Sequence, residues 1–87
     1  MTNPFAELET PCVLVDFDIA EANIDRFQAY CDKVNLKSRP HIKTHKLPKL
    51  AARQADVGGI GITCQKISEA EVMADAGIED ILITYNI

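Results

Sequence analysis

The sequence lacks the features that would assign it to several other classes of protein. It has no apolar stretch of membrane-spanning length and no basic N-terminal segment followed by an apolar run, so we expect no membrane span and no secretory signal. Its three cysteines, Cys12, Cys31 and Cys64, are odd in number, widely spaced and without a C-x-x-C pair. This pattern argues against a disulfide framework and against a zinc knuckle. We therefore expect a cytoplasmic protein whose thiols are reduced and buried.

Acidic residues are missing from one part of the chain. The formal net charge is −4, which argues against nucleic acid as a general partner. The window 37–53 nevertheless contains no Asp or Glu and holds six of the nine basic residues. These six are Lys37, Arg39, Lys43, Lys46, Lys49 and Arg53. A local positive field on an acidic protein suits a small anionic ligand, although a solvated helix face would also explain Lys49 and Arg53.

The apolar pattern alternates between the periods of strands and helices. With 87 residues, of which 47% are hydrophobic and 25% charged, the chain has the composition of one small globular domain. Short runs predict strands at 12–17, 38–44, 59–64 and 80–85. Caps and helical spacing predict helices from Asp18 to about Asn35, from Pro48 to Gly58-Gly59, and from a Ser68/Glu71 capping box to Gly77.

This alternation predicts an α/β fold with a parallel sheet and right-handed crossovers. We interpret residues 1–87 as the N-terminal part of a (β/α)8 TIM barrel, which needs about 250 residues in all. The sequence stops directly after a strand, so we expect it to be the opening piece of a longer protein. These strands are too few to close a barrel, and on their own they are expected to be inactive and to expose sheet edges.

The run 38–46 is the candidate site, because it combines the pattern of a strand with five ionisable residues. Alternation predicts that Arg39, His41 and Lys43 share one face, with Lys43 at the carboxyl end of the strand. In a barrel, catalytic groups lie at that end. A partly desolvated lysine near other cations has a lowered pKa and becomes a nucleophile that forms a Schiff base with a carbonyl. The alternative is a plain cation that binds phosphate or carboxylate.

Other candidate residues have simpler explanations. On a strand, His41 and His45 would lie roughly 13 Å apart, too far to share a metal ion unless the strand ends between them. His41 is better explained by a hydrogen bond within the pocket or by a satisfied position in the core. Cys64 is more plausible as a buried structural thiol than as a nucleophile. Glu69 and Glu71 are sufficiently explained by the first turn of a helix, where carboxylates favour the dipole.

Three motifs in this order resemble one enzyme family. They are Thr10-Pro11-Cys12-Val13-Leu14-Val15-Asp16, Arg39-Pro40-His41-Ile42-Lys43-Thr44-His45-Lys46 and Cys64-Gln65-Lys66-Ile67-Ser68-Glu69-Ala70-Glu71. From Thr10 onward the chain resembles the N-terminal part of the D-threonine aldolase and D-serine dehydratase family, fold-type III pyridoxal-phosphate enzymes with an alanine racemase-type barrel. The resemblance implies that Lys43 carries pyridoxal phosphate through a Schiff base.

The resemblance also defines what this sequence does not contain. It implies a lyase that cleaves or dehydrates small β-hydroxy D-amino acids, with a divalent metal whose ligands lie outside these residues. It further implies that the strand at 12–17 belongs to a second, β-rich domain. We expect the full-length protein to be a homodimer. An amino-acid racemase and a pyridoxal-phosphate carrier protein without catalysis are the alternatives.

Overall fold

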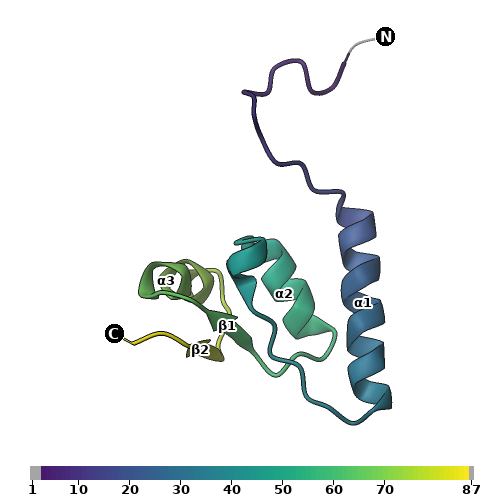
Figure 1. Ribbon diagram of the computed structural model, residues 1–87, viewed down its shortest axis with the longest axis vertical. Coiled ribbons are helices and arrows are strands. Elements are labelled where there is room, and N and C mark those ends of the chain that lie inside the picture. Colours follow the sequence, from purple (N-terminus) through teal and green to yellow (C-terminus); the bar gives the residue numbers. More distant parts are fainter. Residues whose placement is uncertain (1–2, 87) are drawn as a thin grey trace.

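The computed structural model describes residues 3–86 and shows helices alternating with parallel extended segments (Figure 1). The elements are α1 (Phe17–Lys33), the 3₁₀ turn η1 (Ile42–Thr44), α2 (Pro48–Asp56), β1 (Ile62–Cys64), α3 (Ile67–Asp75) and β2 (Ile81–Ile83). Strands β1 and β2 pair in parallel, with Ile62 opposite Ile81. The predicted α/β alternation is therefore confirmed. No helix within residues 3–86 has the length and apolar character needed to cross a membrane.

A third extended segment, residues 38–41, lies on the other side of β1. The Ile60 N–H donates to the Ser38 carbonyl at 2.9 Å, and the Thr63 N–H donates to the Pro40 carbonyl at 2.8 Å. A parallel bridge between His41 and Thr63 completes the pairing. The predicted strand at 38–44 thus ends at His41, because the chain coils into η1 at the next residue. Arg39 and His41 share a face as predicted, whereas Lys43 lies on the turn beyond the strand.

The predicted strand at 12–17 is wrong. Residues 12–16 are extended but pair with no strand in the part of the chain that the structure describes, and Val13 is 90% exposed. Figure 1 shows this segment leading away from the helices and strands. Helix α1 begins at Phe17, with Asp16 rather than Asp18 as its N-cap, since the Asp16 carboxylate accepts the Ile19 N–H. An apolar run forms a strand only where a partner strand can take up its backbone hydrogen bonds. The assignment of this segment to a second domain stays a prediction.

All three α-helices end in the same type of turn. At the end of α2, Gly58 has φ +129° and the Gly59 N–H donates back to the Gln54 carbonyl at 3.0 Å. Helix α3 repeats this arrangement at Gly77, and α1 ends with Asn35 at φ +58°. Such turns satisfy carbonyls at the helix terminus and favour glycine or asparagine, which tolerate a left-handed backbone. The helix stops that the sequence predicted at Gly58-Gly59 and Gly77 are confirmed.

The core lies between the strands and the helices. Ile62 and Cys64 of β1 pack with Ile42, Ala51 and Met73, and each of these five side chains is at most 1% exposed. Helices α2 and α3 lie on this side of the strands and contact each other, and α1 packs against α2 (Figure 1). Of the three thiols expected to be buried, those of Cys31 and Cys64 are buried. Cys12 is exposed because it belongs to the unpaired segment.

The opposite face of the strands carries polar residues in layers. The strand register places Arg39, Gly61 and Asp80 level with one another at the amino ends. Arg39 reaches across Gly61, where its Nη1 donates to the Asp80 carboxylate at 2.8 Å and to the Ile62 carbonyl at 3.2 Å. A Cβ atom on Gly61 would lie 2.5 Å from the Asp80 carbonyl oxygen and 2.7 Å from that Nη1. Only glycine therefore leaves room for the ion pair.

We predict that Gly61→Ala lowers the free energy of unfolding of the full-length protein by about 3 kcal/mol, because the new methyl group overlaps backbone that cannot move aside. Gly77→Ala is the matched control, since Gly77 also has a positive φ, +100°, but a Cβ there meets nothing within 4 Å. That control should cost about 1 kcal/mol from backbone strain alone. Chemical denaturation measures both values, and equal costs would contradict the close approach at Gly61.

Candidate active site at the carboxyl edge of the strands

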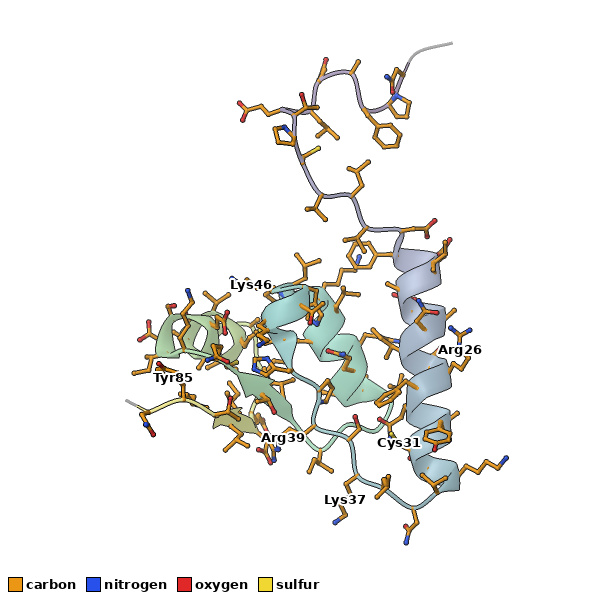
Figure 2. The ribbon with its side chains drawn as sticks, in the orientation of Figure 1. Arg26, Cys31, Lys37, Arg39, Lys46 and Tyr85 are labelled. Atoms are coloured by element: carbon orange, nitrogen blue, oxygen red, sulfur yellow. The ribbon has the colours of Figure 1, made fainter. Side chains whose placement is uncertain are left out.

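Lys43 lies on the turn that follows the segment 38–41. The turn is anchored by Ile42, whose side chain is fully buried, and is closed by the Lys46 N–H, which donates to the Ile42 carbonyl at 2.7 Å. The Lys43 side chain is exposed. Carboxyl ends of parallel strands meet at one edge of a sheet, so this turn lies at the same edge as the turn that follows β1. Figure 2 shows Arg39 and Lys46 at opposite ends of the strands.

His41 supports the turn and presents a free ring N–H. The Lys43 backbone N–H donates to His41 Nδ1 at 3.2 Å, so Nδ1 is unprotonated and Nε2 carries the ring proton. Nε2 is buried and has no hydrogen-bond partner among residues 3–86. A buried donor without an acceptor is unfavourable, and such atoms are commonly satisfied by a bound group. The structure therefore places an available donor beside the turn that carries Lys43.

His45 has both ring nitrogens engaged. Its Nδ1 accepts the Leu47 N–H at 2.9 Å, and its Nε2 lies 3.2 Å from the Gln54 Oε1 atom. Because Nδ1 accepts, Nε2 carries the proton and donates to Gln54. His45 thus joins the turn to helix α2 in a structural role. The four-residue spacing of His41 and His45 suggested a metal site from the sequence, but in the structure the two rings make different hydrogen bonds.

Three of the six basic residues in the window form ion pairs with acidic residues from elsewhere in the chain. The charged partners are Asp80 for Arg39 at 2.8 Å, Asp25 for Arg53 at 2.8 Å and Glu69 for Lys46 at 3.7 Å. The Lys49 ammonium lies 4.4 Å from the centre of the Phe17 ring. Lys43 makes no ion pair within residues 3–86. Among the basic residues of this window, Lys43 is therefore left at this edge as an amine without a carboxylate partner in the described residues, next to His41.

Glu69 is the site residue that sequence reasoning missed. Helix α3 begins at Ile67 with Lys66 as its N-cap and without a side-chain cap, so the predicted Ser68/Glu71 capping box is wrong. Instead, the buried Glu69 carboxylate accepts the Gln65 N–H at 2.9 Å. This hydrogen bond lowers the pKa of Glu69 against the opposing effect of burial, and the nearby Lys46 charge adds to the lowering. Nothing in the sequence distinguished Glu69 from the exposed Glu71 two residues later.

Cys64 is not an activated nucleophile. Its side chain is fully buried, and burial, followed by the charge of Glu69, raises the pKa of its thiol. A thiol becomes a nucleophile by losing its proton, and this environment opposes that loss. The expected structural role of Cys64 therefore agrees with its surroundings.

The cysteines should react with iodoacetamide in an order set by these environments. At neutral pH we predict that Cys12, which is exposed, is alkylated at least tenfold faster than Cys31 and Cys64, which are buried. Mass spectrometry of peptides taken at intervals measures the three rates. Alkylation of Cys64 as fast as that of Cys12 would contradict the buried, protonated thiol.

The architecture and this edge together define an α/β protein with a candidate ligand site. Parallel segments are covered on one face by helices, and α/β proteins bind their ligands at the carboxyl ends of such strands. The groups gathered here are an uncompensated primary amine and a buried imidazole N–H. This combination suits a ligand that has both an electrophilic carbon and a hydrogen-bond acceptor.

Comparison with known proteins identifies the relatives of this chain. It is 42% identical over 85 residues to a D-threonine aldolase from Arthrobacter sp and 39% identical over 83 residues to a 3-hydroxy-D-aspartate aldolase from Paracoccus denitrificans. These matches cover 98% and 94% of this chain, and 22% and 21% of the relatives. No known protein-family profile matches the sequence.

Solved structures agree with these sequence relatives. A variant of D-threo-3-hydroxyaspartate dehydratase in the metal-free form superposes with a TM-score of 0.86 at 36% identity, over 99% of this chain and 23% of that protein. The chain is therefore homologous to the D-threonine aldolase, 3-hydroxy-D-aspartate aldolase and D-threo-3-hydroxyaspartate dehydratase family. The family resemblance stated from the motifs is confirmed. The chain spans about a fifth of the length of these relatives.

Proposed function

We propose that this chain supplies the cofactor lysine of a pyridoxal-phosphate-dependent lyase that acts on β-hydroxy D-amino acids. The observation that carries the proposal is Lys43, an exposed amine without an ion pair in residues 3–86, next to a buried imidazole N–H without an acceptor. The homology to two aldolases and a dehydratase supports the reaction class. The activity is proposed for the full-length protein.

The residues at this edge fit pyridoxal phosphate. Its aldehyde needs a primary amine for covalent attachment, and Lys43, at the carboxyl edge of the strands, has no carboxylate partner in the described residues. Its oxygen atoms offer acceptors for the proton on His41 Nε2. When bound, the cofactor supplies an electron sink for the carbon atoms next to the substrate amine. We assign Lys43 to covalent attachment and His41 to hydrogen bonding with the cofactor.

Lys43 has a second role in this proposal. When it is not attached to the cofactor, the Lys43 amine would be available at the site as a base that moves a proton at the substrate Cα. The Lys43 backbone N–H donates to His41, so the backbone of Lys43 is held in place while its side chain can move. Freedom of the side chain combined with a fixed backbone suits a group that must act first as an attachment point and then as a base.

We also propose that the complete fold is the (β/α)8 barrel expected from the sequence. Support comes from three parallel extended segments in chain order, with α2 and α3 on one face. On the other face, the levels Arg39-Gly61-Asp80 and His41-Thr63-Leu82 are arranged like the layers that fill a barrel interior. The homodimer and the second domain stay predictions.

The substrate class follows from the names of the relatives. Threonine and 3-hydroxyaspartate both carry a hydroxyl group on Cβ, and each relative acts on a D-form or D-threo compound. We propose that a divalent metal binds this hydroxyl and lowers its pKa, which favours cleavage or dehydration at Cβ. Residues 3–86 contain no cluster of three or more side chains able to hold a metal ion. We propose, from the family resemblance, that the metal ligands lie outside these residues.

The first test is covalent labelling of Lys43. The full-length protein loaded with pyridoxal phosphate should absorb visible light, and borohydride reduction should fix the cofactor to Lys43, as measured by peptide mass spectrometry. Lys43→Ala should abolish turnover, because attachment and proton transfer both use that amine. Label on Lys46 or Lys49 instead would refute the assignment.

Two variants serve as comparisons in this test. Lys37→Ala removes another lysine from the same basic window, at an exposed position outside the turn, and should leave labelling and turnover unchanged. His41→Leu removes the ring donor and keeps the amine, so Lys43 should still be labelled while cofactor affinity falls about tenfold. Unchanged affinity in His41→Leu would refute the role of His41 in binding.

Metal removal separates the lyase from the alternatives. Treatment of the full-length protein with a chelator should abolish cleavage or dehydration of β-hydroxy D-amino acids, and added divalent metal should restore it. Racemase activity or simple cofactor binding should be unaffected by the chelator. Full lyase activity in rigorously metal-free protein would refute the metal-assisted reaction.

A further inference from the structure

A buried carboxylate joins the two turns at the carboxyl edge of the strands. Glu69 lies in the first turn of α3, where its side chain is 8% exposed. One oxygen, Oε1, accepts the Gln65 N–H at 2.9 Å, on the turn that follows β1. The other, Oε2, lies 3.7 Å from the Lys46 ammonium, on the turn that carries Lys43. One side chain therefore contacts both turns.

The turn that carries Lys43 needs such support. Lys46 has φ +54°, a left-handed conformation that a residue with a Cβ atom adopts only when its surroundings hold it there. The turn is three residues of 3₁₀ helix, which has poorer hydrogen-bond geometry than α-helix. Its fixed points are buried Ile42, the rings of His41 and His45, and the charge of Glu69.

We propose that Glu69 is a positioning residue that holds the lysine-bearing turn, residues 43–47, against the turn that follows β1. The proposal rests on the proposed function, in which Lys43 attaches the cofactor. The stronger contact is the hydrogen bond from Gln65 to a buried carboxylate, because charge-assisted bonds with good geometry exceed exposed ion pairs in strength. That bond fixes the carboxylate at the start of α3, whereas the Lys46 contact, which is weaker because its ammonium is largely exposed, is the one that reaches the turn 43–47. Glu69 does not touch the reacting atoms and acts through the backbone.

The test compares variants of the full-length protein in two measurements. The first is hydrogen exchange of the unloaded protein, followed in peptides that cover 43–47, 65–66, α1 and α2. The second is the rate at which pyridoxal phosphate becomes fixed to Lys43 under borohydride trapping. Glu69→Ala should speed exchange in 43–47 and 65–66 about tenfold and slow capture at Lys43 about tenfold, while α1 and α2 remain unchanged.

Conservative variants show which property of Glu69 matters. Glu69→Gln keeps an acceptor oxygen for Gln65, so exchange in 65–66 should stay within about threefold of the unmodified protein. It removes the charge that faces Lys46, so exchange in 43–47 and capture at Lys43 should change in the same direction as in Glu69→Ala. Glu69→Asp keeps the charge but withdraws the oxygen by one methylene, so it should behave like Glu69→Ala. Glu71→Gln is the matched control, because Glu71 is exposed on the same helix, and it should change nothing.

Three results would overturn the proposal. They are unchanged exchange in 43–47 in Glu69→Ala, exchange that rises equally in α1 and α2, and exchange in 43–47 that is as slow in Glu69→Gln as in the unmodified protein. If Glu69→Ala fails to fold, Glu69→Gln and Lys46→Met decide, because each removes the contact between the two turns and should speed exchange in 43–47 while exchange in 65–66 stays within about threefold. Hydrogen exchange requires no cofactor, so it tests Glu69 separately from the proposed function. That function fails instead if Lys43 is not labelled in the unmodified protein.

Discussion

The pairing of β1 on both sides is the constraint on which the rest of the structure depends. Its amide groups bond to the segment 38–41 on one side, and the strand pairs with β2 on the other. A strand held in this way presents one face to α2 and α3, where Ile62 and Cys64 are fully buried. The other face places Thr63 beside His41. Parallel pairing also brings the turns after each strand to one edge, which is why the candidate site is there.

Charge is distributed differently at the two ends of these strands. At the amino ends, Arg39 and Asp80 form a direct ion pair across Gly61, and this pair joins three segments. At the carboxyl ends, Lys46 has only a distant partner in Glu69, and Lys43 has no carboxylate partner within the described residues. At the amino ends the charge of Arg39 is thus neutralised within the chain. At the carboxyl ends the Lys43 amine is left available for a ligand. The basic residues at both ends of the strands come from the same window, 37–53.

The two histidines of the run 38–46 show how small differences in position decide roles. Both accept a backbone N–H at Nδ1, and both therefore carry the ring proton on Nε2. In His45 that proton meets the Gln54 side chain, whereas in His41 it is buried without an acceptor in residues 3–86. The histidines stand four residues apart in the sequence, yet only His41 belongs to the strand face. Its ring is the one that keeps a buried N–H without an acceptor in the described residues.

The sequence by itself determined which segments are helices, where α2 and α3 stop, and the position of Lys43 near a carboxyl end. Helical spacing, Pro48 at the start of α2, and glycine at 58 and 77 act within a few residues, so they can be recognised without knowing the fold. Only the tertiary structure decided that the strand ends at His41, that residues 12–16 remain unpaired and that Glu69 contacts two turns. Strand pairing and burial join residues far apart in the chain, and their energies depend on which partners meet. For that reason the sequence could not show that Glu69 is buried and Glu71 exposed. It also could not show which apolar runs have a partner strand and which, like residues 12–16, have none in the described residues.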